Sequence, residues 1–202
     1  MSMTRPCRAA GFSLIELMVT ITLMSILVML AVPSFSEWVQ NNKVRTVSES
    51  LQNGLRLAQT EALRRSRQVV FSLTNSSDPK TSLTAVANGR NWSLNTVNLM
   101  TDDLNTADAT LVEYGKFAAV GTDVTITGPV SICFNSVGRM VANSNPGPTN
   151  AVCTVSTAAP VVAYNVSATN ATRPLRVTVG LGGQVRMCDP ARTLSTTATD
   201  GC

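Results

Sequence analysis

The feature that most constrains this chain is an uncharged apolar run near its start. Residues 17–36 carry no charged side chain, and most of them are Leu, Ile, Val or Met. A helix of that length spans about 30 Å, which matches the hydrocarbon core of a bilayer. The first ten residues contain Arg5 and Arg8 and no acidic residue. This basic flank predicts that the start of the chain stays in the cytoplasm and that the rest is exported.

A removable secretory signal also has a basic start and an apolar core. The run in this chain is longer than the usual core of about 7–15 residues, and no pattern of small residues marks a cleavage site at its far end. We therefore expect a retained membrane helix. Pro33 lacks a backbone N–H and is expected to interrupt the helical hydrogen bonds late in the span.

The next segment, residues 37–67, has the periodicity of an amphipathic helix. Its small and aliphatic residues recur at steps of three and four, which places them on one face. These residues are Val44, Val47, Leu51, Leu55, Ala58 and Ala62. On the same helix, Glu61 and Arg65 are four residues apart and form a favourable pair. The apolar stripe needs a cover, and a sheet formed by the rest of the chain is the natural one.

A basic cluster ends this segment, where Arg64, Arg65 and Arg67 lie close together in the sequence. Cations at the carboxyl end of a helix complement its dipole, which is the role we expect. A contact with nucleic acid is the alternative.

Residues 68–202 contain short β-rich runs separated by Asn, Gly, Pro and Ser, a pattern that predicts strands joined by turns. The expected strands are 68–74, 82–87, 91–97, 110–114, 124–127, 130–134, 139–142, 161–166, 175–179 and 184–188. The glycine-rich residues 180–183 predict a hairpin turn between the last two. We therefore expect an α+β fold in which one long N-terminal membrane helix packs on antiparallel sheet.

The residues around the start of the apolar run carry a resemblance to a known family. Residues 11–17 read Gly-Phe-Ser-Leu-Ile-Glu-Leu, after a basic leader and before a long apolar run. This combination resembles the cleavage and methylation signature of type IV prepilins and type II secretion pseudopilins. The resemblance implies that a prepilin peptidase cuts between Gly11 and Phe12 and methylates the new amino group of Phe12.

Glu16 would be the fifth residue of the processed chain. A lone carboxylate at the edge of an apolar span costs a few kcal/mol in the membrane unless it finds a partner. The resemblance implies that this partner is the charged amino terminus, at Phe12, of a neighbouring subunit. The pair would set the register of one subunit on the next. The alternative is that Glu16 merely sits at the membrane interface.

Two later segments resemble the GspH/FimT branch of this superfamily. The first covers residues 58–65 and the strand that follows at 69–71. The second covers residues 173–179 and 183–190. Residues 75–130 match this branch poorly, which suggests an insertion.

Of the five cysteines, Cys7 lies in the segment that processing would remove. The other four fall in the exported part, where an even number indicates disulfides. Four cysteines allow three pairings, and we expect the nearest neighbours to join: Cys133 with Cys153, and Cys188 with Cys202. A four-cysteine metal site is the alternative, but no two cysteines have the Cys-x₂-Cys spacing.

The composition argues against an enzyme. Histidine is absent, which excludes Ser-His-Asp and Cys-His nucleophile systems and histidine metal ligands. The acidic residues are scattered, and the adjacent Asp102 and Asp103 are expected in a solvated loop. No glycine motif for phosphates or dinucleotides is present. We therefore expect no catalytic residues, no cofactor and no metal.

The carboxyl end of the chain is locally basic. It contains Arg173, Arg176, Arg186 and Arg192. Some members of the GspH/FimT branch bind DNA through a Gly-Arg-x-Arg motif near this position. Residues 183–186 read Gly-Gln-Val-Arg, so the second arginine is kept and the first is glutamine. These arginines are candidate DNA contacts; the alternative is that they alternate along two strands and face solvent.

The resemblance implies a minor pilin that is held in the inner membrane and then enters, primes or caps a type IV pilus. Its partners would be other pilins or pseudopilins, prepilin peptidase and the inner membrane. One alternative is a minor pseudopilin of a type II secretion system. Another is a pilin that binds DNA for natural transformation. The chain would divide into a leader (1–11), an apolar helix (12–36), its amphipathic continuation (37–67) and a β-rich periplasmic domain (68–202).

Overall fold

The computed structural model describes residues 11, 13–76, 83–97, 111–117, 123–156 and 160–202. Its dominant element is α1 (Leu14–Arg65), a single helix of 52 residues. Ser13 caps the start, because its Oγ accepts a hydrogen bond from the backbone N–H of Glu16. Ser66 ends the helix by adopting a left-handed conformation with φ 51°. The amphipathic segment therefore stops two residues earlier than expected.

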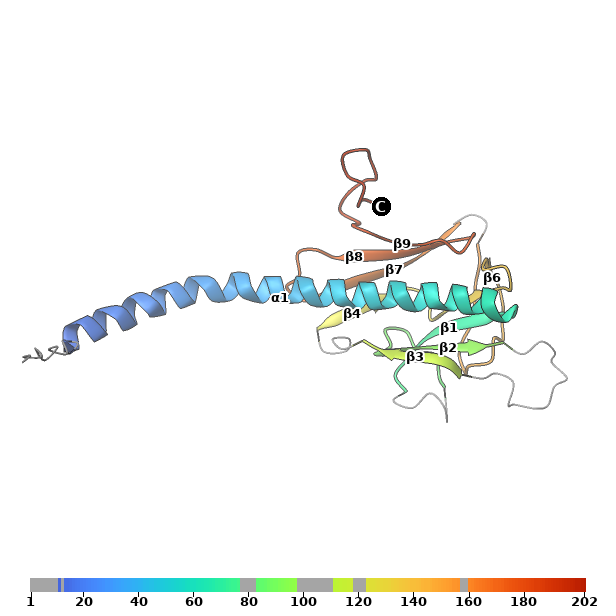
Figure 1. The fold of residues 1–202 in the computed structure, drawn as a ribbon, viewed down its shortest axis with the longest axis horizontal. Helices are drawn as coiled ribbons and strands as arrows, with labels where there is room; N and C mark the ends of the chain where they lie inside the picture. Colours follow the sequence, from blue (N-terminus) through green and yellow to red (C-terminus); the bar gives the residue numbers. More distant parts are fainter. Residues whose placement is uncertain (1–10, 12, 77–82, 98–110, 118–122, 157–159) are drawn as a thin grey trace, which may run out of the picture.

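Pro33 lies inside α1, which continues past it, so the missing N–H does not end the helix. A proline removes one backbone hydrogen bond, and the turns on either side hold the helix together across it. The N-terminal half of α1 curves gently as it leaves the rest of the protein (Figure 1).

Two antiparallel sheets accompany the helix, as the α+β prediction requires. The five-stranded sheet has the order β3-β2-β1-β5-β6 and the four-stranded sheet has the order β4-β7-β8-β9. The first contains β1 (Val69–Thr74), β2 (Asn91–Thr96), β3 (Leu111–Lys116), β5 (Ser131–Phe134) and β6 (Met140–Val141). The second contains β4 (Val124–Thr127), β7 (Val161–Ala168), β8 (Leu175–Gly180) and β9 (Val185–Cys188). The domain half of α1 runs between β7–β9 on one side and β1–β3 on the other (Figure 1).

One expected strand does not form in the described part of its range. Residues 83–87 make only single bridges, from Thr84 to Thr149 and from Ala85 to Thr74. Adjacent residues of this segment therefore pair with two different parts of the chain, and neither pairing continues into a strand. The start of this expected strand, the Asp102–Asp103 pair and much of the proposed insertion lie outside the described residues.

The main core forms where the apolar stripe of α1 meets both sheets. All six residues of the stripe predicted from the sequence are at most 1% exposed. Phe71 connects the sheets: its ring lies 6.0 Å from that of Trp92 and 6.4 Å from that of Tyr164. Tyr164 is fully buried, and burial raises the pKa of its hydroxyl.

Two glycines make room for the Trp92 ring. Gly54 faces it from α1, where a Cβ would lie 3.0 Å from Phe71 and 3.1 Å from Trp92. Gly115 lies directly opposite Trp92 in the β2–β3 pair, and a Cβ there would overlap the indole. The indole therefore fills the space that two missing side chains leave, which fixes how closely α1 approaches β2.

A smaller cluster occupies the opposite face of the five-stranded sheet. There the Cys133–Cys153 disulfide packs with Val70 and Val97. This disulfide is almost completely buried, since its two residues are 1% and 3% exposed. It ties the loop after β6 to β5 and so covers the second face of the sheet.

Candidate functional site

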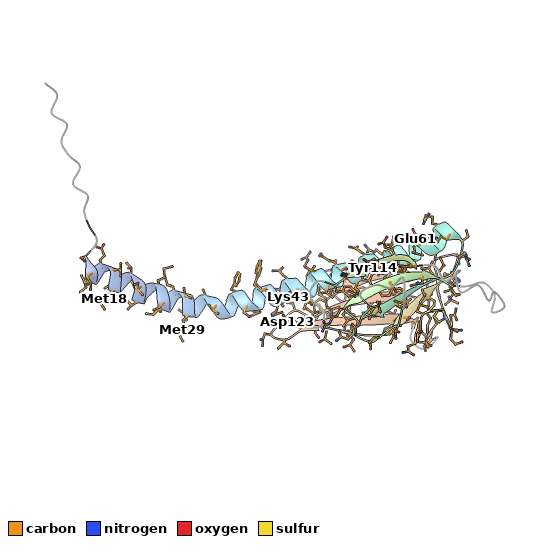
Figure 2. All side chains as sticks on the ribbon, turned by 90° about the horizontal axis from the view of Figure 1, so that it is seen from below. Met18, Met29, Lys43, Glu61, Tyr114 and Asp123 are labelled. Atoms are coloured by element: carbon orange, nitrogen blue, oxygen red, sulfur yellow. A yellow bond between two sulfur atoms is a disulfide. The ribbon has the colours of Figure 1, made fainter. Side chains whose placement is uncertain are left out.

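The N-terminal part of α1, from Leu14 to Val32, projects from the domain as an isolated apolar rod. Its large hydrophobic residues from Leu14 to Val32 are all at least half exposed. Met18 and Met29 extend from the helix where no other described part of the chain approaches it (Figure 2). A helix that is apolar on all sides and uncovered requires a lipid or protein environment. In the described residues, α1 is also the one helix long and apolar enough to cross a membrane.

The few polar side chains of the rod are satisfied within the helix. The hydroxyl of Thr20 donates to the carbonyl of Leu17 (2.9 Å), and that of Ser25 donates to the carbonyl of Thr22 (2.8 Å). The hydroxyl of Thr22 donates in turn to carbonyls of the preceding turn. Internal bonding of this kind lowers the cost of placing a hydroxyl in lipid.

Glu16 is the one charged residue of the rod, and it lies in the first turn of α1. No other described residue bonds to its carboxylate, so the charge can be met from outside the subunit. Gly11 is exposed, and Phe12 lies outside the described residues. Leader cleavage, methylation of Phe12 and the contact of Glu16 with a neighbouring amino terminus therefore stay predictions.

The helix enters the domain through contacts that we call the neck clamp: Glu37, Asn41 and Lys43 of α1 with Asp123, Thr172 and Arg173 of two loops. Asn41 Oδ1 accepts from the backbone N–H groups of Thr172 (3.1 Å) and Arg173 (3.0 Å). The Thr172 hydroxyl donates to Glu37 Oε1 at 2.6 Å. These bonds join residues more than 130 positions apart, and no sequence signal pointed to them.

The second half of the neck clamp is an ion pair. Lys43 Nζ lies 2.5 Å from Asp123 Oδ2, and the two residues meet where α1 reaches the domain (Figure 2). The hydrogen bond and charge of Lys43 hold the pKa of Asp123 below its usual value. The loop at Thr172 and the loop at Asp123 contact α1 on different turns. The neck clamp therefore fixes the direction in which the apolar rod leaves the domain.

The four carboxyl-terminal arginines do not form one free basic surface. Arg176 donates to Asn165 Oδ1 at 2.7 Å, on the face of the four-stranded sheet that points away from α1. Arg186 lies on the same face, and its Nη2 donates to the carbonyls of Thr199 (2.9 Å) and Gly201 (3.0 Å). Arg192 pairs with Asp200 at 3.0 Å. Arg173 is different: nothing else in the described chain bonds to its guanidinium.

These contacts build a closed carboxyl-terminal loop. The second disulfide joins Cys188, the last residue of β9, to Cys202, and so closes residues 189–201 into a loop. The backbone N–H of Asp189 donates to the carbonyl of Asp200 (2.7 Å), and that of Cys202 donates to Arg192 (2.9 Å). The loop projects on the side of β8 and β9 away from α1 (Figure 1). The sequence suggested Arg186 as a phosphate contact, whereas the structure uses part of its hydrogen-bonding capacity to hold this loop.

The basic cluster at the end of α1 is also engaged in internal contacts. Arg64 and Arg65 both donate to Glu61, at 2.6 Å and 2.8 Å. The hydrogen bond from Arg64 and then that from Arg65 lower the pKa of Glu61 to about 2. Both arginines lie in the last turn of the helix, where they complement its dipole.

Among the described residues, no group of three Cys, Asp or Glu side chains is arranged to hold a metal ion. What remains is an apolar rod whose one carboxylate has no bonding partner among the described residues, joined to a β domain that contains two disulfides. An exposed helix joined to such a domain defines a pilin-like protein.

Comparison with family models gives the particular family. The model described as "Type II transport protein GspH" matches residues 47–183, about two thirds of the chain. The model described as "Prokaryotic N-terminal methylation motif" matches residues 7–32. The chain therefore belongs to the GspH family. It is a pilin-like subunit of the kind found in type IV pili and type II secretion systems.

Solved structures with a similar fold include the type IV minor pilin FimU of Pseudomonas aeruginosa. It is 12% identical, with 72% of this chain and 96% of FimU covered and a TM-score of 0.45. Another is the minor pseudopilin EpsH from the type 2 secretion system of Vibrio cholerae. It is 9% identical, with 74% of this chain and 99% of EpsH covered and a TM-score of 0.43. No curated protein sequence matches this chain.

Proposed function

We propose that this protein is a minor pilin of a type IV pilus. Before assembly, the processed chain is held in the inner membrane with its β domain in the periplasm. It then enters the filament, or it primes or caps the filament. The observation that carries this proposal is the apolar rod of α1, which is exposed on all sides and bears at its end a carboxylate with no partner among the described residues. A rod of this kind suits first the bilayer and then a bundle of similar helices.

In this proposal Gly11 and Phe12 form the processing site and Glu16 selects the register of assembly. The carboxylate of Glu16 pairs with the methylated amino group of Phe12 in a neighbouring subunit. Pairing removes two charges from an apolar environment, where each alone is costly. The subunit therefore has its lowest free energy at the one position along the filament axis where Glu16 pairs with this amino group.

The test compares Glu16→Leu with the wild-type protein in the cells that produce it. Membrane insertion is expected to be unchanged, because the substitution lengthens the apolar span. Incorporation into sheared filaments is expected to fall strongly, because the amino group of the neighbour loses its partner. Glu49→Leu, on the exposed domain part of α1, is the matched control. Normal incorporation of the Glu16→Leu protein would contradict the pairing.

A minor pseudopilin of a type II secretion system is the second candidate, and membership of the GspH family, which is named for type II transport, favours it. A deletion strain scored for both twitching motility and protein secretion separates the two. Loss of secretion with normal pili would assign the protein to the secretion system.

A further inference from the structure

The neck of the molecule contains a groove of about 610 Å³ between α1 and the end of the four-stranded sheet. One wall is the helix at Glu37, Trp38 and Asn41, and the other includes Arg173, Leu175 and Asp189. The groove lies where the apolar rod meets the domain. Its position with respect to a membrane therefore follows from the position of α1.

The groove begins at the membrane surface if the apolar rod spans the bilayer. Phe35 and Trp38 are 66% and 61% exposed, and their rings lie 5.8 Å apart. Exposed aromatic pairs at the end of an apolar span are typical of the membrane–water interface. Asn41 is five residues beyond the uncharged run, or about 7.5 Å along the helix. This distance is comparable to the depth of one headgroup layer, about 5–8 Å.

The charges on the groove leave one cation and one anion available. Asp189 and Asp200 both pair with Arg192, at 3.8 Å and 3.0 Å, and Arg45 pairs with Glu49. Arg173 and Glu37 have no ionic partner among the described residues. Thr172 and Arg173 of the β7–β8 loop lie against neighbouring turns of α1, because the Thr172 hydroxyl donates to Glu37 while the backbone N–H of Arg173 donates to Asn41.

We propose that this groove binds the headgroup of phosphatidylethanolamine in the periplasmic leaflet, with Arg173 on the phosphate and Glu37 on the ammonium group. The proposal rests on the membrane position of α1 under the proposed function. A guanidinium binds phosphate through two parallel hydrogen bonds. A primary ammonium can donate to the carboxylate of Glu37. A choline headgroup has no N–H to donate, and a glycerol headgroup carries no cation.

The site has a consequence for the membrane-bound subunit. A bound headgroup fixes the depth of the neck in the bilayer and gives two exposed charges, Arg173 and Glu37, an ionic partner. On entry into a filament the lipid must leave, so the groove stabilises the subunit before assembly and not after it.

The experiment uses the full chain in detergent micelles. It is titrated with phosphatidylethanolamine, phosphatidylcholine and phosphatidylglycerol of the same acyl length, and bound lipid is counted by native mass spectrometry. We expect phosphatidylethanolamine to bind at least about fivefold more tightly than the other two, which corresponds to about 1 kcal/mol. Arg173→Gln is expected to lower its affinity about tenfold. Glu37→Gln should remove the preference over phosphatidylglycerol, while keeping an acceptor for Thr172.

Arg139→Gln is the matched control, since Arg139 belongs to the turn before β6 and does not line the groove. Equal affinity of the wild-type protein for the three lipids would overturn the proposal without depending on any variant. It is also overturned if Arg173→Gln lowers filament incorporation but leaves lipid affinity unchanged, which would assign the groove to a neighbouring subunit. Selective lipid binding together with normal assembly of Glu16→Leu would contradict the assembly role and leave the lipid site standing.

Discussion

Lys43 of α1 and Asp123, 80 residues further along the chain, form an ion pair with Nζ and Oδ2 2.5 Å apart. The pair lies at the neck of the molecule, where the apolar rod begins to project from the domain (Figure 2). Together with the bonds of Asn41 to the β7–β8 loop, it holds α1 from two sides. A subunit that must stack its helix in a bundle needs this direction to be defined.

Asp123→Asn is expected to loosen the direction of α1 while leaving the domain folded. The ion pair is partly exposed and lies outside the core, so unfolding should change little. Spin labels on Ser36→Cys and Thr127→Cys report the angle between helix and domain. Their distance distribution should broaden. Arg45→Gln removes an ion pair within α1 alone and should leave it unchanged. An unaltered distribution in Asp123→Asn would show that the Asn41 contacts suffice.

The sequence predicted the features that depend on local spacing. The stripe from Val44 to Ala62 follows from the helical period, and burial in the structure confirms it. The hairpin at residues 180–183 is confirmed by the pairing of β8 with β9. Gly183 also requires its glycine, since φ is 88° and a Cβ would overlap Gly138.

Contacts between residues far apart in the sequence could not be predicted in this way. The bonds of Asn41 with Thr172 and the contact of Trp92 with Gly115 join residues that only the completed fold brings together. Arg186 is a second example of a residue whose contacts depend on the completed fold. Its sequence context made it a candidate phosphate contact, which stays a prediction, whereas its hydrogen bonds to the carbonyls of Thr199 and Gly201 follow only from its position on β9.

Glu61 should contribute to the stability of the domain at neutral pH and lose that contribution in acid. Its pKa is lowered to about 2 in the folded protein, from an unfolded value near 4.5. The contribution is complete above the unfolded value and disappears as the pH falls toward 2. Two partly exposed helix pairs suggest about 1 kcal/mol in total. Urea unfolding between pH 6 and 2 should show a shallower pH dependence for Glu61→Gln than for the wild-type protein; equal slopes would contradict the assignment.

Gly115→Ala is expected to destabilise the protein by about 1–3 kcal/mol, because its Cβ would overlap the Trp92 indole and force the ring out of the space that Gly54 and Gly115 leave for it. Gly182→Ala is the matched control, since a Cβ there meets nothing within 4 Å. Urea unfolding monitored by far-UV circular dichroism measures both changes. Equal stability of the two variants would mean that Trp92 can move without cost.

The two disulfides should differ in their reactivity toward a thiol reductant. Cys133 and Cys153 are 1% and 3% exposed, whereas Cys202 lies exposed at the end of the carboxyl-terminal loop. Reduction requires a thiolate to reach a sulfur atom, so Cys188–Cys202 should open first under native conditions. Arg186→Gln removes two bonds to the loop and should accelerate this step, while Arg139→Gln should not. Timed alkylation followed by peptide mass spectrometry measures both rates. Simultaneous opening of the two disulfides would indicate that reduction proceeds through global unfolding and not through the exposed loop.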